Sequence, residues 1–157
     1  MKSTVYIETS IISYYTSYPS RDMVIAGRQQ ITREWWDNHR HIFNIYISAM
    51  VLQETRKGDH SASMKREGIV RDIPLLEITA TVQELADILM RKGPIPKQCP
   101  EDALHIAVAA VHEIDFLLTW NFKHINNAQI KNDISKIIML AGHESPMICT
   151  PEELLGE

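Results

Sequence analysis

Short runs of β-branched and aromatic residues alternate along the chain with longer stretches in which apolar residues recur at helical spacing. The runs predict buried strands, because a strand covered on both faces is apolar nearly throughout. The stretches predict helices that bury one face. The predicted strands lie at 4–7, 43–48, 75–78, 116–119 and 146–149, and the predicted helices at 22–39, 49–57, 62–71, 81–92, 100–113 and 130–140.

Residues that are typical of helix ends support several of these boundaries. Ser48 is placed to cap the helix that follows it, and Gly58 to close that helix. Thr81 and Glu84 have the spacing of a capping box. Pro100 is suited to the first position of a helix that is apolar on nearly every side, which predicts that this helix is buried.

Strands separated by helices predict a parallel sheet with helices on both faces. We therefore expect the α/β class, as a three-layer sandwich around a central, mostly parallel, five-stranded sheet. The 157 residues suit one domain over 1–157, and the chain has no repeat or linker. Residues 150–157 are expected to form a last helical turn or a frayed end.

The amino-acid composition indicates the class and location of the protein more clearly than its function. A hydrophobic fraction of 45% and a charged fraction of 23% are typical of a soluble globular protein. Cys99 and Cys149 belong to no motif, which favours a reducing, cytoplasmic location, and no segment is expected to enter a membrane. The net charge of −4 disfavours bulk electrostatic binding of nucleic acid, but carboxylates that await a metal would also produce it. His39 and His41 have no cysteine or acid at a spacing that suits zinc.

Polar residues recur where the predicted strands end. Glu8 directly follows the first strand, Glu54 lies on the apolar stripe of the helix after the second, and Asn121 follows the fourth. Asp102 lies in the first turn of the buried helix. In an open parallel sheet ligands bind outside the carboxyl ends of the strands, so these four side chains are expected to converge.

Each acid has a simpler interpretation. Glu8 is compatible with a strand end at the surface, and Glu54 with a solvated pair to Arg56 or Lys57. The helix dipole favours an acid such as Asp102 in a first turn without any function. The prediction therefore depends on convergence and on no single acid.

Carboxylates that are held together repel one another unless a cation compensates them. Their hard oxygen atoms select Mg²⁺ or Mn²⁺. Such ions lower the pKa of a bound water and stabilise the oxyanions of an in-line displacement at phosphorus. The chemistry that this pattern favours is phosphodiester hydrolysis by a metal-activated water.

Four neighbouring residues are candidates for substrate contact. Thr9 and Ser10 are placed to orient a water or to contact phosphate, although Ser10 is equally suited to capping the next helix. Thr119 is either an ordinary strand residue or a hydrogen-bond donor to one of the site's ligand side chains. Lys123, with His124 next to it, is positioned to meet an RNA phosphate, although scattered surface charge is the simpler interpretation.

Two further features favour structural roles. His105 lies on the buried helix and is expected to be a hydrogen-bonded core histidine. Trp35 and Trp36 are suited to stacking on bases, but helical spacing favours packing in the core or at a dimer interface.

The motifs that carry these residues resemble those of PIN domains. YIETS at 6–10 is similar to the family's strand-end motif, and VLQE at 51–54 to the helix with its glutamate. EDALHIAVA at 101–109 is similar to the motif whose aspartate binds metal, and LLTWN at 117–121 to the fourth-strand motif. The order and spacing agree over nearly the whole chain. The length and single-domain build look like VapC-type toxins of toxin–antitoxin pairs.

This resemblance implies a Mg²⁺- or Mn²⁺-dependent endoribonuclease with Glu8, Glu54 and Asp102 as ligands and Asn121 as an auxiliary. RNA, a cognate antitoxin protein and a second copy of the chain are the implied partners. Glu8 replaces the usual aspartate and Asn121 an expected acid, and Asp115 lies at the wrong end of the sheet to substitute. One well-bound ion is therefore expected, with a second arriving with substrate. The alternatives are a PIN-like RNA- or protein-binding module without catalysis, and a related metal-dependent DNA nuclease.

Overall fold

A single parallel sheet runs through the centre of the protein in the computed structural model, which describes residues 1–156. The strand order is β3-β2-β1-β4-β5, and every pairing is parallel. The strands are β1 (Thr4–Ile7), β2 (Asn44–Ser48), β3 (Leu75–Leu76), β4 (Phe116–Leu118) and β5 (Met147–Cys149). Val5 of β1 sets the register at the centre, because it pairs with Ile45 on one side and Phe116 on the other. The predicted α/β class and five strands are confirmed.

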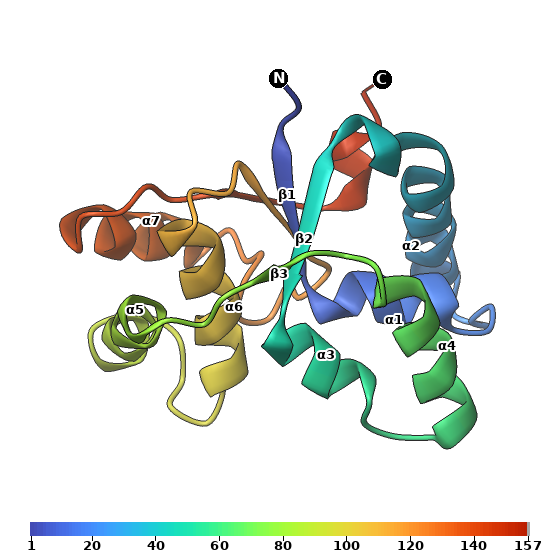
Figure 1. Ribbon diagram of the computed structural model, residues 1–157, viewed down its shortest axis with the longest axis horizontal. Coiled ribbons are helices and arrows are strands. Elements are labelled where there is room, and N and C mark those ends of the chain that lie inside the picture. The colour runs from blue at the N-terminus through green and yellow to red at the C-terminus, as the bar shows by residue number, and fades with distance from the viewer. Residues whose placement is uncertain (157) are drawn as a thin grey trace.

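Helices cover both faces of this sheet (Figure 1). They are α1 (Thr9–Thr16), α2 (Met23–Glu34), the π-helix η1 (Trp35–His39), the 3₁₀-helix η2 (Arg40–Ile42), α3 (Ala49–Thr55), α4 (His60–Val70), α5 (Ala80–Arg91), α6 (Pro100–Val111), α7 (Lys131–Leu140) and the 3₁₀-helix η3 (Pro151–Leu154). In Figure 1, α1, α2 and α4 lie on one side, and α5, α6 and α7 lie on the other. This arrangement is the predicted three-layer sandwich. Within residues 1–156 no helix is both long and apolar enough to cross a membrane.

The order in which strands are added to the sheet reverses between β1 and β4, although all strands stay parallel. From β1 the chain steps outward to β2 and then β3, and afterwards it returns to β4 on the opposite side of β1. Connections on the two sides use helices on opposite faces, so the carboxyl ends of β1 and β4 bound a crevice. These ends lie at the lower edge of the sheet in Figure 1. The topology thus places the residues after β1 and β4 side by side.

The core is built from the central strand and the helices packed on it. The side chains of β1 from Val5 to Ile7 are fully buried, as are Ile106 and Ala109 of α6. Trp35 and Trp36 are also buried, where Trp35 packs near Phe43 at 5.9 Å between ring centroids. Of the roles considered for these tryptophans, core packing is therefore the right one.

Local capping differs from the prediction in two places. Helix α5 begins at Ala80 because the hydroxyl of Thr79 accepts a hydrogen bond from the amide of Val82 at 3.3 Å. The predicted capping box of Thr81 and Glu84 is wrong, since the cap lies two residues earlier. Ser48 is the N-cap residue of α3, as expected, but its hydroxyl makes no capping bond.

The segment after β1 also departs from the sequence pattern, which predicted no element there. It forms α1, and this helix starts at Thr9, so Ser10 lies inside the helix and does not cap it. At the other end of the chain, the predicted last helical turn is confirmed as η3, where Thr150 and Glu153 form a capping box.

Candidate active site

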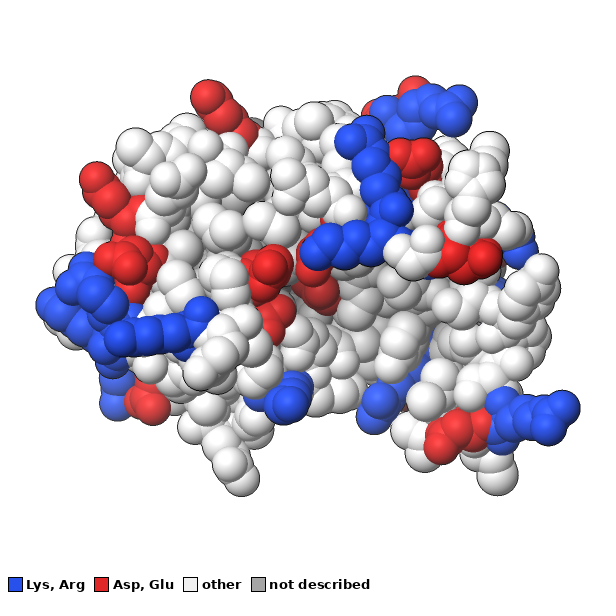
Figure 2. Space-filling view, turned by 90° about the horizontal axis from the view of Figure 1, so that it is seen from below, with Lys and Arg blue, Asp and Glu red and all other residues white. Residues whose placement is uncertain are grey.

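The edge of the sheet where the strands end carries a group of acidic side chains. Figure 2 looks onto this edge from below and shows acidic atoms near the middle of the face, beside a hollow, with lysine and arginine side chains around them. A separate hollow of about 440 Å³ lies between α5 and α7, where the residues that line it are Lys92, Gly93, Pro94, Asp133, Lys136 and Ile137. It contains none of the predicted site residues, and its walls carry no arrangement that suggests catalysis.

Glu8 is the most buried acid at this edge, with 5% of the residue exposed. Its Oε1 atom accepts hydrogen bonds of 2.5 Å from the hydroxyls of Ser10 and Thr119. Within residues 1–156 it has no Lys, Arg or His partner within 4 Å. A carboxylate that is removed from water without a cationic partner carries a large desolvation cost, which a bound cation would relieve.

Ser10 and Thr119 join the ends of β1 and β4. The Ser10 hydroxyl also accepts a hydrogen bond from the amide of Trp120 at 2.8 Å, and Thr119 accepts one from the amide of Asn121 at 2.9 Å. Both hydroxyls are therefore fixed by backbone groups of the segment after β4, and both donate to Glu8. Of the two roles predicted for Thr119, the hydrogen-bond donor to a ligand side chain agrees with this geometry.

Glu54 belongs to a chain of hydrogen bonds that runs into the core. Its Oε1 atom accepts from the Thr9 hydroxyl at 2.6 Å and lies 2.7 Å from Nε2 of His105. The other ring nitrogen of His105 lies 2.7 Å from the hydroxyl of Tyr6, which in turn lies 2.8 Å from the hydroxyl of Ser48. Since His105 is 1% exposed, the prediction of a hydrogen-bonded core histidine is confirmed. Ser48, the N-cap residue of α3, therefore makes no capping hydrogen bond because its hydroxyl completes this buried chain.

Each member of the Glu54–His105 pair shifts the pKa of the other. Burial acts to raise the pKa of Glu54, but the hydrogen bond and charge of His105, together with the Thr9 hydroxyl, outweigh it and lower the pKa. Burial likewise acts to lower the pKa of His105, but its hydrogen bond to Glu54 and the charges of nearby carboxylates raise it. Both shifts favour the charged pair.

Asp102 makes a second carboxylate–histidine pair at the rim of the same edge. Its Oδ2 atom lies 2.9 Å from Nδ1 of His124, and its Oδ1 accepts a hydrogen bond from the side-chain Nδ2 of Asn121 at 3.0 Å. The side-chain Oδ1 of Asn121 accepts a hydrogen bond from the backbone amide of His124 at 3.1 Å. In this arrangement the side-chain nitrogen of Asn121 orients Asp102. The side-chain oxygen of Asn121 is turned toward the backbone of the same loop.

The three predicted carboxylate ligands do not form one tight cluster. His105 bonds to Glu54 alone among them, and the charges of Glu8 and Asp102 add to the raising of its pKa. In the described part of the chain, however, the group of metal-ligating side chains whose ligand atoms all lie within 4.8 Å of one another is Cys99, Asp102 and His124. An ion bound by all three carboxylates therefore requires their side chains to turn inward.

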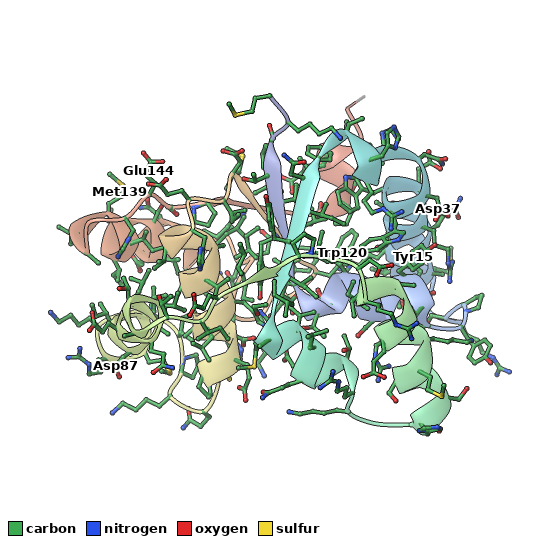
Figure 3. The ribbon with its side chains drawn as sticks, in the orientation of Figure 1. Tyr15, Asp37, Asp87, Trp120, Met139 and Glu144 are labelled. Atoms are coloured by element: carbon green, nitrogen blue, oxygen red, sulfur yellow. The ribbon has the colours of Figure 1, made fainter. Side chains whose placement is uncertain are left out.

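The segment after β4 also carries an aromatic and basic surface. Trp120, labelled in Figure 3, is buried two residues after β4. Its ring stacks on Tyr14 of α1 with 5.9 Å between the ring centroids, and its indole N–H donates to Thr32 at 2.8 Å. The Arg28 guanidinium lies 4.9 Å from the ring centre of Phe122, which is 40% exposed. Lys123 is exposed on the same loop. Cationic and aromatic groups thus flank the acids on the side of α2.

Compared with known protein families, curated proteins and solved structures, the chain matches none of them. The likeness to PIN domains therefore depends on the four sequence motifs, and the shared α/β architecture does not by itself imply a function.

Sequence reasoning missed two members of the site region. Cys99 belongs to no motif, and its position beside Asp102 follows from the turn that leads into α6. His124 was predicted only as a contact for phosphate, although in the structure it pairs with Asp102. The spacing of 22 residues between them carries no recognisable signal, because the loop after β4 alone determines their contact.

Proposed function

We propose that this protein is a PIN-type, Mg²⁺- or Mn²⁺-dependent endoribonuclease. The observation that carries the proposal is Glu8, a carboxylate with 5% exposure and, among the described residues, no Lys, Arg or His nitrogen within 4 Å, at the topological switch point of a parallel sheet. Glu54 and Asp102 approach the same region from α3 and α6. Such a set of oxygen donors suits a hard divalent cation.

The residues divide into ligands and residues that orient them. Glu8, Glu54 and Asp102 would hold the ion, which would supply Lewis-acid activation of a water and stabilisation of phosphate oxyanions. Thr9 fixes one oxygen of Glu54, and Asn121 fixes one oxygen of Asp102. Ser10 and Thr119 together fix one oxygen of Glu8. These hydrogen bonds order each carboxylate before a cation binds, and the side chains must still turn inward to share one ion.

RNA is proposed as the substrate because the four motifs resemble those of PIN domains and the length and single-domain build look like VapC-type toxins. The same resemblance supports a cytoplasmic toxin with a cognate antitoxin and a homodimeric state. Lys123 and the Arg28–Phe122 surface beside the acids supply positive charge and an exposed ring, which are the groups that bind the phosphates and bases of a single strand.

A cleavage assay with the purified protein tests this proposal. Labelled single-stranded RNA, duplex RNA and DNA are incubated with Mn²⁺ or with EDTA, and the wild type is compared with Asp102→Asn and Glu101→Gln. We expect Mn²⁺-dependent internal cleavage of RNA that falls at least about 100-fold in Asp102→Asn, about 2.7 kcal/mol of transition-state stabilisation. Glu101→Gln is the matched control, because it removes an acid from the same first turn of α6.

Other results would assign a different function. RNA binding without cleavage, equal in the wild type and Asp102→Asn, would favour a binding module. Cleavage confined to DNA would favour a DNA nuclease. Calorimetric titration adds an independent measurement, since we expect one well-bound Mn²⁺ in the wild type and clearly weaker binding in Glu8→Gln.

A further inference from the structure

Cys99 lies at the mouth of the candidate site with a thiol that the fold does not use. It is the N-cap residue of α6, yet its side chain makes no capping hydrogen bond. Asp102 is three residues further, at the position whose side chain turns back toward the N-cap. The turn into α6 therefore brings a sulfur and a carboxylate together by local geometry.

His124 completes this group from a different part of the chain. Its ring reaches Asp102 from the loop after β4, at 2.9 Å, and the ligand atoms of Cys99, Asp102 and His124 all lie within 4.8 Å of one another. In a tetrahedral zinc site, bonds of roughly 2.0–2.3 Å place neighbouring ligand atoms about 3.3–3.6 Å apart. Small rotations of these three side chains are sufficient to reach that geometry.

The donor types select a different ion from the one proposed for catalysis. Mg²⁺ takes oxygen ligands, whereas a thiolate with an imidazole suits Zn²⁺ and its relative Co²⁺. The three residues are all partly exposed, so a water can occupy the fourth position. Three protein ligands with one open position form a recognised pattern for zinc.

We propose that Cys99, Asp102 and His124 form a Zn²⁺ site at the rim of the candidate active site, and that Zn²⁺ bound there inhibits the enzyme. Inhibition rests on the proposed function, because it follows from the sharing of Asp102. Zn²⁺ would draw Asp102 away from the oxygen site and would break its hydrogen bond to His124. Zinc binding itself is independent of any nuclease activity.

Cobalt absorption is the direct test of the site. The full-length, reduced protein is titrated with Co²⁺ alone, and a sulfur-to-cobalt charge-transfer band in the near ultraviolet reports coordination by a cysteine. We expect a band with one Co²⁺ per chain that Zn²⁺ abolishes by displacement. Cys99→Ala should lose the band, and His124→Ala should bind more weakly by over about 100-fold, since the loss of residues that only orient a ligand already costs roughly 10–100-fold.

Cys149→Ala is the matched control for the thiol. Cys149 is buried in β5, and burial raises the pKa of its thiol to about 12, so we expect it to contribute nothing to the cobalt band. Cys99→Ala should fold normally, because its side chain contributes no capping bond, and the unfolding temperature of each variant verifies this. A band that is unchanged in a folded Cys99→Ala, or absent from the wild type, would overturn the site.

The inhibitory role is tested separately by Mn²⁺-dependent RNA cleavage with increasing Zn²⁺. We expect Zn²⁺ to inhibit the wild type and Cys149→Ala at concentrations at least about tenfold below those needed for Cys99→Ala. Equal inhibition of all three would overturn the regulatory role. A protein that binds Co²⁺ through Cys99 but cleaves no RNA would contradict the proposed function and leave the zinc site established, so the two failures are distinguishable.

Discussion

Two carboxylate–histidine pairs lie at the same edge of the sheet and differ mainly in the burial of the histidine. Glu54 and His105 are 2.7 Å apart, and Asp102 and His124 are 2.9 Å apart. His105 is 1% exposed and both of its ring nitrogens have partners within the protein, whereas the His124 side chain is 19% exposed. The chemistry of the two pairs is thus nearly the same, but their surroundings are not.

Burial of the histidine gives the two pairs different roles. The inner pair, Glu54 and His105, continues through Tyr6 to Ser48, so it ties α3 and α6 to the central strands. The outer pair, Asp102 and His124, ends at solvent beside Cys99, where a ligand can approach both of its members. A buried histidine of this kind fixes the position of its carboxylate, whereas a partly exposed histidine can itself turn to a metal ion.

The largest expected effect is on stability and separates the two histidines. We expect His105→Ala to lower the free energy of unfolding by about 3 kcal/mol, because it leaves a cavity in the core and removes the buried partner of Glu54 and Tyr6. His124→Ala should cost less, about 1 kcal/mol, because this ion pair is partly exposed to solvent. Urea denaturation in EDTA, followed by circular dichroism, measures both. Equal losses would contradict the difference between the two pairs.

A second prediction concerns the outer pair and the missing fourth acid. Asn121→Asp replaces an amide that donates to Asp102 at 3.0 Å with a like charge. We therefore expect lower stability without metal and about tenfold tighter Mn²⁺ binding, about 1.4 kcal/mol. Calorimetry and thermal unfolding with and without Mn²⁺ measure this change. Asn132→Asp on the exposed face of α7 adds the same charge elsewhere, and equal behaviour of the two variants would rule out a specific role for position 121.

The smallest expected effect is the pH dependence of the inner pair. The pKa of Glu54 is lowered from its ordinary value of 4.5, so its stabilisation is present above pH 4.5 and is lost as pH falls through the lowered pKa. The pKa of His105 is raised from 6.5, so its stabilisation is present below pH 6.5 and is lost as pH rises through the raised pKa. Both contributions are complete between about pH 4.5 and 6.5.

Denaturation of metal-free protein across this range measures the profile. The difference in unfolding free energy between the wild type and His105→Gln should be greatest in that window and should decrease on both sides. His124→Gln is the control, and its difference from the wild type should be smaller. A difference for His105→Gln that is independent of pH would contradict the charged inner pair.

Much of the fold was predictable from sequence because it depends on local patterns. The five strands and the buried helix α6 follow from apolar runs and from Pro100, and their alternation implies a parallel sheet. Errors fell where side chains had competing partners. Thr79 rather than Thr81 caps α5, and Ser48 bonds to Tyr6 instead of capping α3, which no spacing in the sequence reveals.

The candidate acids were predictable as a set because strand ends of a parallel sheet share one edge. Their partners were not, since the helix pattern shows His105 as buried but does not show which carboxylate it meets. Likewise, nothing in the spacing of Cys99 and His124 indicates that both lie beside Asp102. Those contacts depend on the turn into α6 and on the loop after β4.

The sequence by itself thus determined the α/β class, the identity of the strands and the edge at which Glu8, Glu54 and Asp102 lie. Periodic burial and the rule for parallel sheets are sufficient for that. Only the tertiary structure decided that Glu8 is buried without a cationic partner among residues 1–156, and that the other two acids pair with histidines of unlike exposure. Burial and pairing distances arise from packing between segments far apart in the chain, which local sequence does not encode.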